Sequence, residues 1–224
     1  EQVIASIAEQ EKLTPELERQ IREAQTLVAV EDLYRPYKPK RRTRAMIAKE
    51  KGLEPLADLI SLQMTREPLE QSAASYISEE SGVGSAEEAI AGAMDILAER
   101  ISDNAQYRTY IRNITVSQGL LTSQARDEKE KSVYEMYYQY QEPVKKAAGH
   151  RILALNRGEK EKFLSVKVEA PEEQILRYLE KQTILRDNPY TAPVLREIVK
   201  DSYERLIGPS IEREIRSDLT EKAE

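Results

Sequence analysis

Apolar residues recur along most of this sequence at the three- and four-residue spacing of one face of an α-helix. One such stripe, Leu17, Ile21, Ala24 and Val28, follows Thr14-Pro15-Glu16, a hydroxyl cap, a first-turn proline and an acid. We expect this helix to extend to about Leu33. Comparable stripes with capping residues before them predict further helices that begin near Gln2, Arg44, Pro55, Ser85, Asp103, Pro171, Pro193 and Pro209.

Two segments interrupt the helical pattern. In Tyr34-Arg35-Pro36-Tyr37-Lys38-Pro39-Lys40, each proline drives the residue before it toward extended backbone, so we expect no helix there. Gly52 is the expected C-terminal cap of the short helix that begins at Arg44.

One segment has the alternation of a β-strand, Phe163-Leu164-Ser165-Val166-Lys167-Val168. Leu120 to Ser123 is a candidate partner for it. The low glycine count of 8 and the aromatic share of 6% argue against a β-sandwich or barrel. The pattern therefore predicts a mainly α fold, a multi-helix orthogonal bundle with at most one short β element.

The length of 224 residues suits one large helical domain or two small ones. We predict a helical domain over residues 1–117, an irregular connector over 118–131 that holds Arg126-Asp127-Glu128-Lys129-Glu130-Lys131, and a second helical part over 132–224. Alternatively, the two helical parts form one domain. A start at Glu1 rather than Met, and an end within a helical pattern, lead us to expect a piece of a larger protein.

Cysteine is absent from the sequence, which excludes disulfides, zinc ribbons and thiol catalysis. No apolar run reaches the roughly 20 residues that span a bilayer. The first residues lack the basic start and apolar stretch of a signal peptide. We therefore expect a cytoplasmic protein.

The charge is distributed unevenly. Residues 34–51, named the basic arm below, hold eight basic residues and one acid, a net charge of +7, so the rest of a chain whose total is −6 carries −13. Arginines favour bidentate contacts with phosphate or carboxylate. The arm is therefore either a phosphate-binding surface or a partner for carboxylates of the acidic remainder, and the residues alone leave both alternatives open.

Catalytic patterns are weak. The single histidine, His150, has no nucleophile near it in sequence and reads as part of a helix start. Gly82-Val83-Gly84 lacks the lysine and hydroxyl residue of a phosphate loop and is expected to be a plain loop. Tyr134, Tyr137, Tyr138 and Tyr140 are expected to pack a core rather than stack on bases. No metal-ligand spacing occurs, so we expect no cofactor and no enzymatic activity.

The arm and several later segments resemble a known family. The run from Val30 to Ala45, continued by Lys51-Gly52-Leu53-Glu54-Pro55-Leu56-Ala57, closely resembles the N-terminal helical region of the Tex family of bacterial transcription accessory proteins. Further matches follow in order, at Asp95-Ile96-Leu97-Ala98-Glu99-Arg100-Ile101, His150-Arg151-Ile152-Leu153-Ala154-Leu155 and Pro209-Ser210-Ile211-Glu212-Arg213-Glu214.

The resemblance implies a helical region with a helix-turn-helix-like part, taken from a multidomain protein that binds nucleic acid in transcription. It also implies that the ribonuclease-H-like and RNA-binding domains of the family lie outside this sequence. We expect the chain to be an interaction scaffold that contacts RNA or DNA backbone with low specificity, with other domains of the parent protein and the transcription machinery as further partners. The predicted contact residues are Arg35, Lys38, Lys40, Arg41, Arg42 and Arg44.

The alternative is a structural or protein-docking module. In that case Tyr34 and Tyr37 are buried, the arginines of the arm pair with carboxylates, and nucleic acid is bound by the missing domains.

Overall fold

The computed structural model describes residues 1–38 and 42–224. Helices dominate it, and their starts follow from local capping chemistry. The Thr14 hydroxyl accepts the N–H of Leu17 at 3.1 Å, and the Asn104 side chain accepts the N–H of Tyr107 at 3.0 Å, as the sequence predicted. No helix in the described part of the chain is both long and apolar enough to cross a bilayer.

The helix predicted from Thr14 to Leu33 is two helices. Ala24 is extended (ψ 130°), and the Thr26 hydroxyl accepts the N–H of Ala29 at 3.1 Å, which caps a new helix. The prediction was wrong here because the apolar stripe continues across the break. The helices before the basic arm are α1 (Gln2–Glu9), α2 (Pro15–Glu23) and α3 (Leu27–Tyr34).

The chain divides into two compact units, each built from separated stretches of sequence. Unit 1 comprises Glu1–Thr109 and Leu176–Ile207, and unit 2 comprises Tyr110–Ile175 and Gly208–Glu224. The domain boundary predicted at 118–131 stays a prediction.

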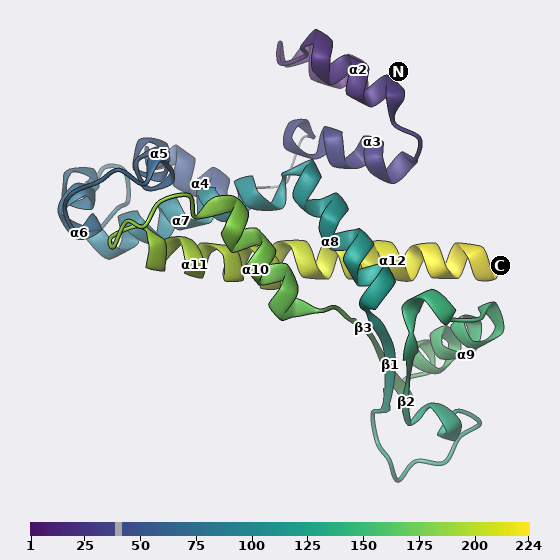
Figure 1. Cartoon of the computed structure of the whole chain (residues 1–224). Coiled ribbons are helices and arrows are strands. Elements are labelled where there is room, and N and C mark those ends of the chain that lie inside the picture. Colours follow the sequence, from purple (N-terminus) through teal and green to yellow (C-terminus); the bar gives the residue numbers. More distant parts are fainter. Residues whose placement is uncertain (39–41) are drawn as a thin grey trace. The chain divides into compact units, whose positions relative to one another are not determined.

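Unit 1 is mainly helical and is centred on α7 (Figure 1). The small side chains of Ala89 and Ala93 allow neighbouring helices to approach α7 closely, and Ile96 completes its buried face. The other helices of unit 1 are α4 (Arg44–Glu50), α5 (Glu54–Leu62), α6 (Leu69–Ala73), α7 (Ala86–Ser102) and α11 (Ala192–Asp201). The boundaries between the units fall within α8 (Ala105–Gln118) and α10 (Glu172–Thr183).

The N-terminal helices of unit 1 have their own apolar cluster. Ile7, Leu17 and Ile21 are buried there, and Tyr34 and Tyr37 pack against them. The basic arm therefore begins on residues that are held by α1 and α2.

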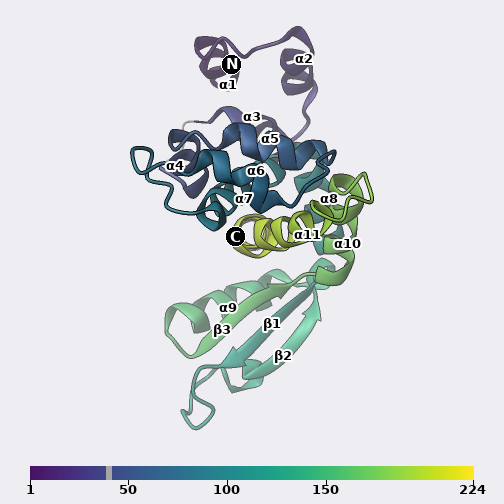
Figure 2. The same ribbon diagram turned by 90° about the vertical axis from the view of Figure 1, so that its left-hand side faces the viewer.

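Unit 2 contains a three-stranded antiparallel sheet in the order β2-β1-β3, with β1 at the centre (Figure 2). The strands are β1 (Leu120–Ala125), β2 (Gln139–Pro143) and β3 (Leu164–Glu169). Thr122 lies opposite Gln141 of β2 and opposite Lys167 of β3. The two helices α9 (Gly149–Lys160) and α12 (Gly208–Ala223) pack with β3.

The sheet corrects the predicted fold class. The mainly α class holds, and the proposed pairing of the 163–168 segment with Leu120–Ser123 is confirmed in β3 and β1. The expectation of at most one short β element was wrong, because β2 completes a sheet. Strand β2 escaped the sequence analysis because Gln139-Tyr140-Gln141-Glu142-Pro143 carries no aliphatic residue. The helix-turn-helix-like part stays a prediction.

Pro209 does not open a separate helix, contrary to expectation. The helical backbone continues from α11 through a π-helical turn, Ser202–Ile207, directly into α12. A proline supplies no N–H to the preceding turn, and a π-helical turn is one of the ways in which a helix accommodates that loss.

Candidate nucleic-acid interface

The basic arm is anchored at its beginning by α1. The Tyr34 hydroxyl lies 2.9 Å from the Ser6 hydroxyl, and the Gln10 side chain donates a hydrogen bond to the Tyr37 carbonyl at 2.6 Å. A 3-10 helix over Arg35–Tyr37 continues from α3, so this part is helical although the prolines led us to expect extended chain. Pro36 fits because a proline in a first turn loses no hydrogen bond.

The arm is anchored a second time, near its middle, by Thr43. The Thr43 hydroxyl accepts the N–H of Met46 at 3.2 Å, which caps α4, and donates to a carboxylate oxygen of Glu99 in α7 at 2.8 Å. Gly52 (φ 77°) ends this helical segment, as predicted, because its backbone lies in the left-handed region that glycine favours. The arm is therefore fixed to the helices of unit 1 on both sides of residues 39–41.

The predicted contact residues do not all lie together. Arg35, Lys38 and Arg44 line one cleft of about 680 Å³ in unit 1. Lys38 and Arg44 are exposed, whereas Arg35 is half-buried. Arg42 is exposed, does not line the cleft, and donates to the carboxylate of Glu50 at 2.7 Å.

Lys40 and Arg41, the other two predicted contacts, lie outside the described residues. The assignment of all six residues to nucleic acid stays a prediction.

Arg205 adds a fourth cation to the cleft, and nothing in the local sequence pointed to it. It lies on the π-helical turn 170 positions from Arg35 in sequence, so no motif could connect the two. Its guanidinium bonds Asp201 at 2.9 Å and lies 3.8 Å from Asp95. The hydrogen bond with Asp201 is the main cause that raises the pKa of Arg205.

The cleft also holds acids, namely Glu31, Asp95 and Glu99. Burial raises the pKa of the Asp95 carboxyl, while the positive charges of Arg205 and Arg44 act in the opposite direction. Arg44 is therefore partly neutralised by an acid of its own unit. The electrostatics of the cleft are mixed rather than uniformly positive.

Most of the remaining lining of the cleft is apolar. It consists of Val3, Leu27, Val30, Tyr34, Ala45 and Leu206, together with the hydroxyl residues Thr43 and Ser102, and Leu27 is 74% exposed. A concave surface that combines apolar walls with a few charged groups suits a partner that presents both apolar and charged chemistry.

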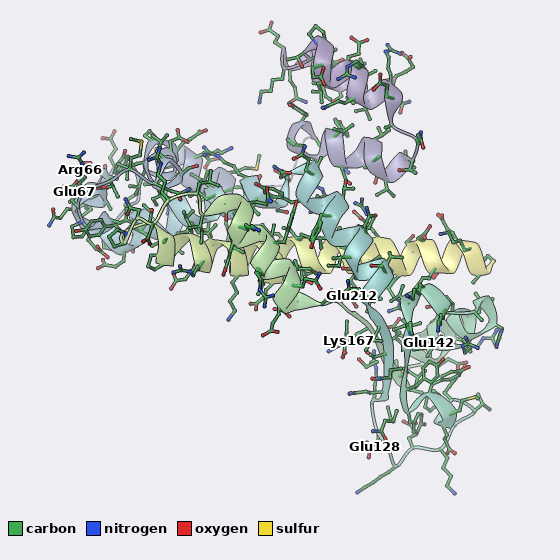
Figure 3. The ribbon with its side chains drawn as sticks, in the orientation of Figure 1. Arg66, Glu67, Glu128, Glu142, Lys167 and Glu212 are labelled. Atoms are coloured by element: carbon green, nitrogen blue, oxygen red, sulfur yellow. The ribbon has the colours of Figure 1, made fainter. Side chains whose placement is uncertain are left out.

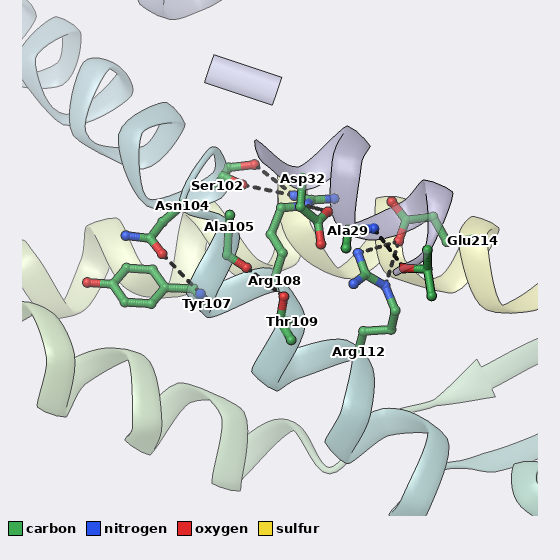
Figure 4. A network of polar contacts seen from close by, with 11 residues as sticks. Ala29, Asp32, Ser102, Asn104, Ala105, Tyr107, Arg108, Thr109, Arg112 and Glu214 are labelled. Atoms are coloured by element: carbon green, nitrogen blue, oxygen red, sulfur yellow. Dashed lines mark hydrogen bonds and ion pairs between the residues drawn. The ribbon is translucent and has the colours of Figure 1, made fainter. Parts of the chain in front are cut away.

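A buried ion pair positions the α3 wall of the cleft (Figure 4). Asp32 of α3 and Arg108 of α8 are both inaccessible to solvent, and Arg108 Nε lies 3.7 Å from Asp32 Oδ1. The Arg108 guanidinium also donates to the Ser102 carbonyl at 2.9 Å. Sequence analysis missed this pair because the two residues are far apart along the chain and each reads locally as a surface charge.

The other candidates behave as structural elements. The N–H of Gly84 donates to the carboxylate of Glu88 at 2.7 Å, so the glycine loop caps its own helix. Tyr134 and Tyr137 are buried, as expected for core residues. His150 is exposed in the first turn of α9, which confirms the helix start predicted there. Among the described residues, no three histidine or acidic side chains are grouped so that they could hold a metal ion.

Comparison with known proteins decides the family. The family model described as Tex central region-like matches residues 63–224. The chain belongs to the Tex central region-like family. The resemblance stated from the sequence is thereby confirmed, although the matching model describes the central region of Tex rather than an N-terminal one.

Several curated proteins are similar to this Tex-family chain. The YdcI protein of Bacillus subtilis is 52% identical over all of the chain. Protein tex of Bordetella pertussis is 45% identical over 74% of it, and the transcriptional accessory protein Tex of Neisseria gonorrhoeae is 37% identical over 73%. The chain spans 32% of the first of these proteins, 21% of the second and 22% of the third.

Proposed function

We propose that this chain is an interaction scaffold of a Tex-like transcription accessory protein in the cytoplasm, and that its basic arm contacts the phosphate backbone of RNA or DNA. One observation carries the proposal. Three residues of the arm, Arg35, Lys38 and Arg44, line the same cleft. The helices of the same unit anchor the arm at Tyr34 and at Thr43. A pre-positioned arm loses less entropy on binding than a free one.

The role is binding rather than catalysis. Guanidinium and ammonium groups that contact phosphates supply affinity and orientation without sequence information. Such binding is weakened by salt because each contact releases condensed counterions. The transcriptional role named for the Neisseria relative supports assigning this binding to transcription.

The test is a fluorescence anisotropy titration with labelled single- and double-stranded RNA and DNA at several salt concentrations. The arm variant carries Lys38→Glu, Arg42→Glu and Arg44→Glu. A matched control carries Lys145→Glu, Lys146→Glu and Lys160→Glu, three exposed lysines of unit 2. Both variants change the net charge by the same amount, so a general charge effect would weaken nucleic-acid binding equally in the two.

We expect the wild type to bind with a logarithmic salt slope of about −2 to −3, which corresponds to three or four phosphate contacts. The arm variant should lose most of this binding and the control should retain it, while circular dichroism shows both to be folded. Equal loss in the two variants, or binding that does not change with salt, contradicts the proposal.

Protein docking is the second candidate, and specific contacts favour it. Arg42 pairs with Glu50, Arg205 lies beside Asp95, and Leu27 exposes an apolar side chain in the same cleft. These features suit an acidic and apolar protein segment from another domain of the parent protein or from the transcription machinery. Absence of nucleic-acid binding by the wild type, at low salt and with every probe, selects this function instead.

A further inference from the structure

The two outer edges of the unit 2 sheet differ in whether side chains of the unit cover their backbone groups. An edge strand presents a row of backbone N–H and C=O groups that can pair with another strand, and proteins usually cover or disrupt such edges. The register of the sheet shows which backbone groups face outward on each edge, because inward and outward residues alternate along an antiparallel strand.

The outer edge of β3 is covered by side chains. The carbonyl of Val166 accepts from the Arg216 guanidinium at 3.2 Å, and the N–H of Val168 donates to the Glu212 carboxylate at 3.3 Å. The carbonyl of Leu164 accepts from Arg126 at 3.2 Å. Each outward-facing residue of β3 therefore has one of its backbone groups bound by a charged side chain.

The outer edge of β2 has no such cover. The N–H of Ala125 donates to the Tyr138 carbonyl and the N–H of Val144 donates to the Gly119 carbonyl, which sets the alternation. It follows that Tyr140 and Glu142 face β1, and that Gln139, Gln141 and Pro143 direct their backbone groups outward. The Pro143 carbonyl is the N-cap acceptor of the 3-10 helix Val144–Lys146. Within the described chain, no other strand of the unit 2 sheet pairs with the outward groups of Gln139 and Gln141, which comprise two N–H donors and two carbonyl acceptors.

The surroundings of β2 also lack the usual protection against pairing. Its outward residues carry neutral amide side chains rather than lysines, and only Pro143, at the end of the strand, removes a donor. Glu142, labelled in Figure 3 with Lys167 and Glu212, is bound by Arg151 at 2.9 Å and so does not guard the edge. Figure 2 shows no helix or strand of unit 2 beside the outer side of β2.

Exposed apolar side chains lie in the segment that leads into β2. The 3-10 helix Glu135–Tyr137 contacts β2, and the Tyr137 and Tyr140 rings meet edge to face at 5.3 Å. Met136, between the two ends of that helix, is 72% exposed, and Val133 just before it is 85% exposed.

We propose that the outer edge of β2 binds an extended peptide segment of a partner protein, which adds to the sheet as a fourth strand. The outward N–H and C=O groups of Gln139 and Gln141 are spaced as in a β-strand, so they match the backbone of an extended peptide. The exposed Met136 and Val133, in the segment just before β2, favour a peptide that also carries apolar residues. This site lies in unit 2 and is independent of the basic arm.

The probe is a capped synthetic peptide with the β3 sequence, Leu-Ser-Val-Lys-Val-Glu, which already pairs with the other side of β1 in this sheet. Amide hydrogen exchange of the whole chain is followed residue by residue by NMR. At millimolar peptide we expect the amides of Gln139 and Gln141 to exchange at least about tenfold more slowly. The amides of Tyr140 and Glu142, which already face β1, should not change.

Two modified peptides test whether the backbone carries the binding. One is N-methylated at the first, third and fifth residues and the other at the second, fourth and sixth, so only one of them retains the donors that face β2. The peptide that retains these donors should bind, and the other should not. Equal binding of the two, or no slowing of Gln139 and Gln141 by the unmodified peptide, overturns the proposal.

Variants of the edge give an independent test. Gln141→Pro removes an outward N–H at a position where an edge strand tolerates proline, and it should abolish peptide binding. Gln141→Thr keeps that N–H and should preserve it. If Gln139 and Gln141 become protected as the protein concentration rises without any peptide, a second copy of the chain occupies the edge and the partner-peptide proposal fails.

Discussion

Asp32 and Arg108 form an ion pair from which solvent is excluded, with 3.7 Å between Arg108 Nε and Asp32 Oδ1. The pair joins α3, which leads into the basic arm, to the first turn of α8. Taking two charges out of water costs several kcal/mol per ion, and the cost is recovered only when both charges are present and hydrogen-bonded. The placement of α3 therefore depends on both residues.

Removing one member of this pair should destabilise the protein strongly. We expect Arg108→Met to lower the free energy of unfolding by about 3–5 kcal/mol, because it leaves the Asp32 carboxylate buried without its partner. Urea unfolding followed by circular dichroism measures the change. Arg19→Met is the control, since Arg19 forms solvent-exposed pairs with Glu16 and Glu23, which contribute little to stability.

The double variant Asp32→Leu with Arg108→Met tests whether the buried unpaired charge causes this loss of stability. An apolar pair of similar volume removes the uncompensated charge, so the double variant should be more stable than Arg108→Met alone. A double variant that is weaker than either single variant would show that shape, rather than charge, fixes α3.

Gly158 allows α9 to pack closely on β3. A Cβ atom at this position would lie 2.5 Å from Leu164 Cδ1 and 3.2 Å from a ring carbon of Tyr134, both of which belong to buried side chains. Overpacking in Gly158→Ala should therefore lower the free energy of unfolding by about 1–3 kcal/mol. The better helix propensity of alanine offsets up to about 1 kcal/mol of this loss.

A double-mutant cycle checks the cause of that loss. Leu164→Ala alone opens a cavity, and in the double variant the new methyl group of residue 158 occupies part of it. The combined loss of stability should be smaller than the sum of the two single losses. Strict additivity would mean that Leu164 is not what excludes a side chain at 158.

The Asp95 carboxyl predicts a pH dependence. Burial raises its pKa in the folded protein, so the folded state holds this proton more tightly than the unfolded state does. Its contribution to stability is therefore complete below the pKa of an unfolded aspartate and is lost as the pH rises through the raised pKa. NMR titration of the Asp95 carboxyl should give a pKa above the usual value for aspartate.

Comparison with Asp95→Asn isolates this contribution. The stability of the wild type relative to the Asp95→Asn variant should fall as the pH is raised from about 3 to 6. A relative stability that rises over that range would mean that the charges of Arg205 and Arg44 outweigh burial.

Local chemistry explains which elements could be predicted from the sequence. The helix starts at Thr14 and Asn104 were predictable because a capping side chain acts within three residues. The break at Thr26 was missed although the same chemistry operates there, because the surrounding apolar stripe is continuous. Strand β2 was missed because its identity depends on its pairing with β1, which lies outside the segment itself.

The candidate site was only partly predictable for a related reason. Arg35, Lys38 and Arg44 were found because they are clustered in sequence. Their acidic neighbours Asp95 and Glu99, together with the cation Arg205, come from α7 and the π-helical turn and meet the arm only through the fold. Sequence analysis therefore identified the charge of the arm but missed the acids that partly neutralise it.

Lysine footprinting of the chain tests the account of the basic arm most directly. The protein is acetylated with and without saturating single-stranded RNA, and modification at each lysine is measured by mass spectrometry. The account predicts that RNA protects Lys38 and Lys40 severalfold at low salt and that Lys145, Lys146 and Lys160 react unchanged. Unchanged reactivity of the arm lysines under conditions where RNA is bound would contradict the account and place the nucleic-acid contact elsewhere on the chain.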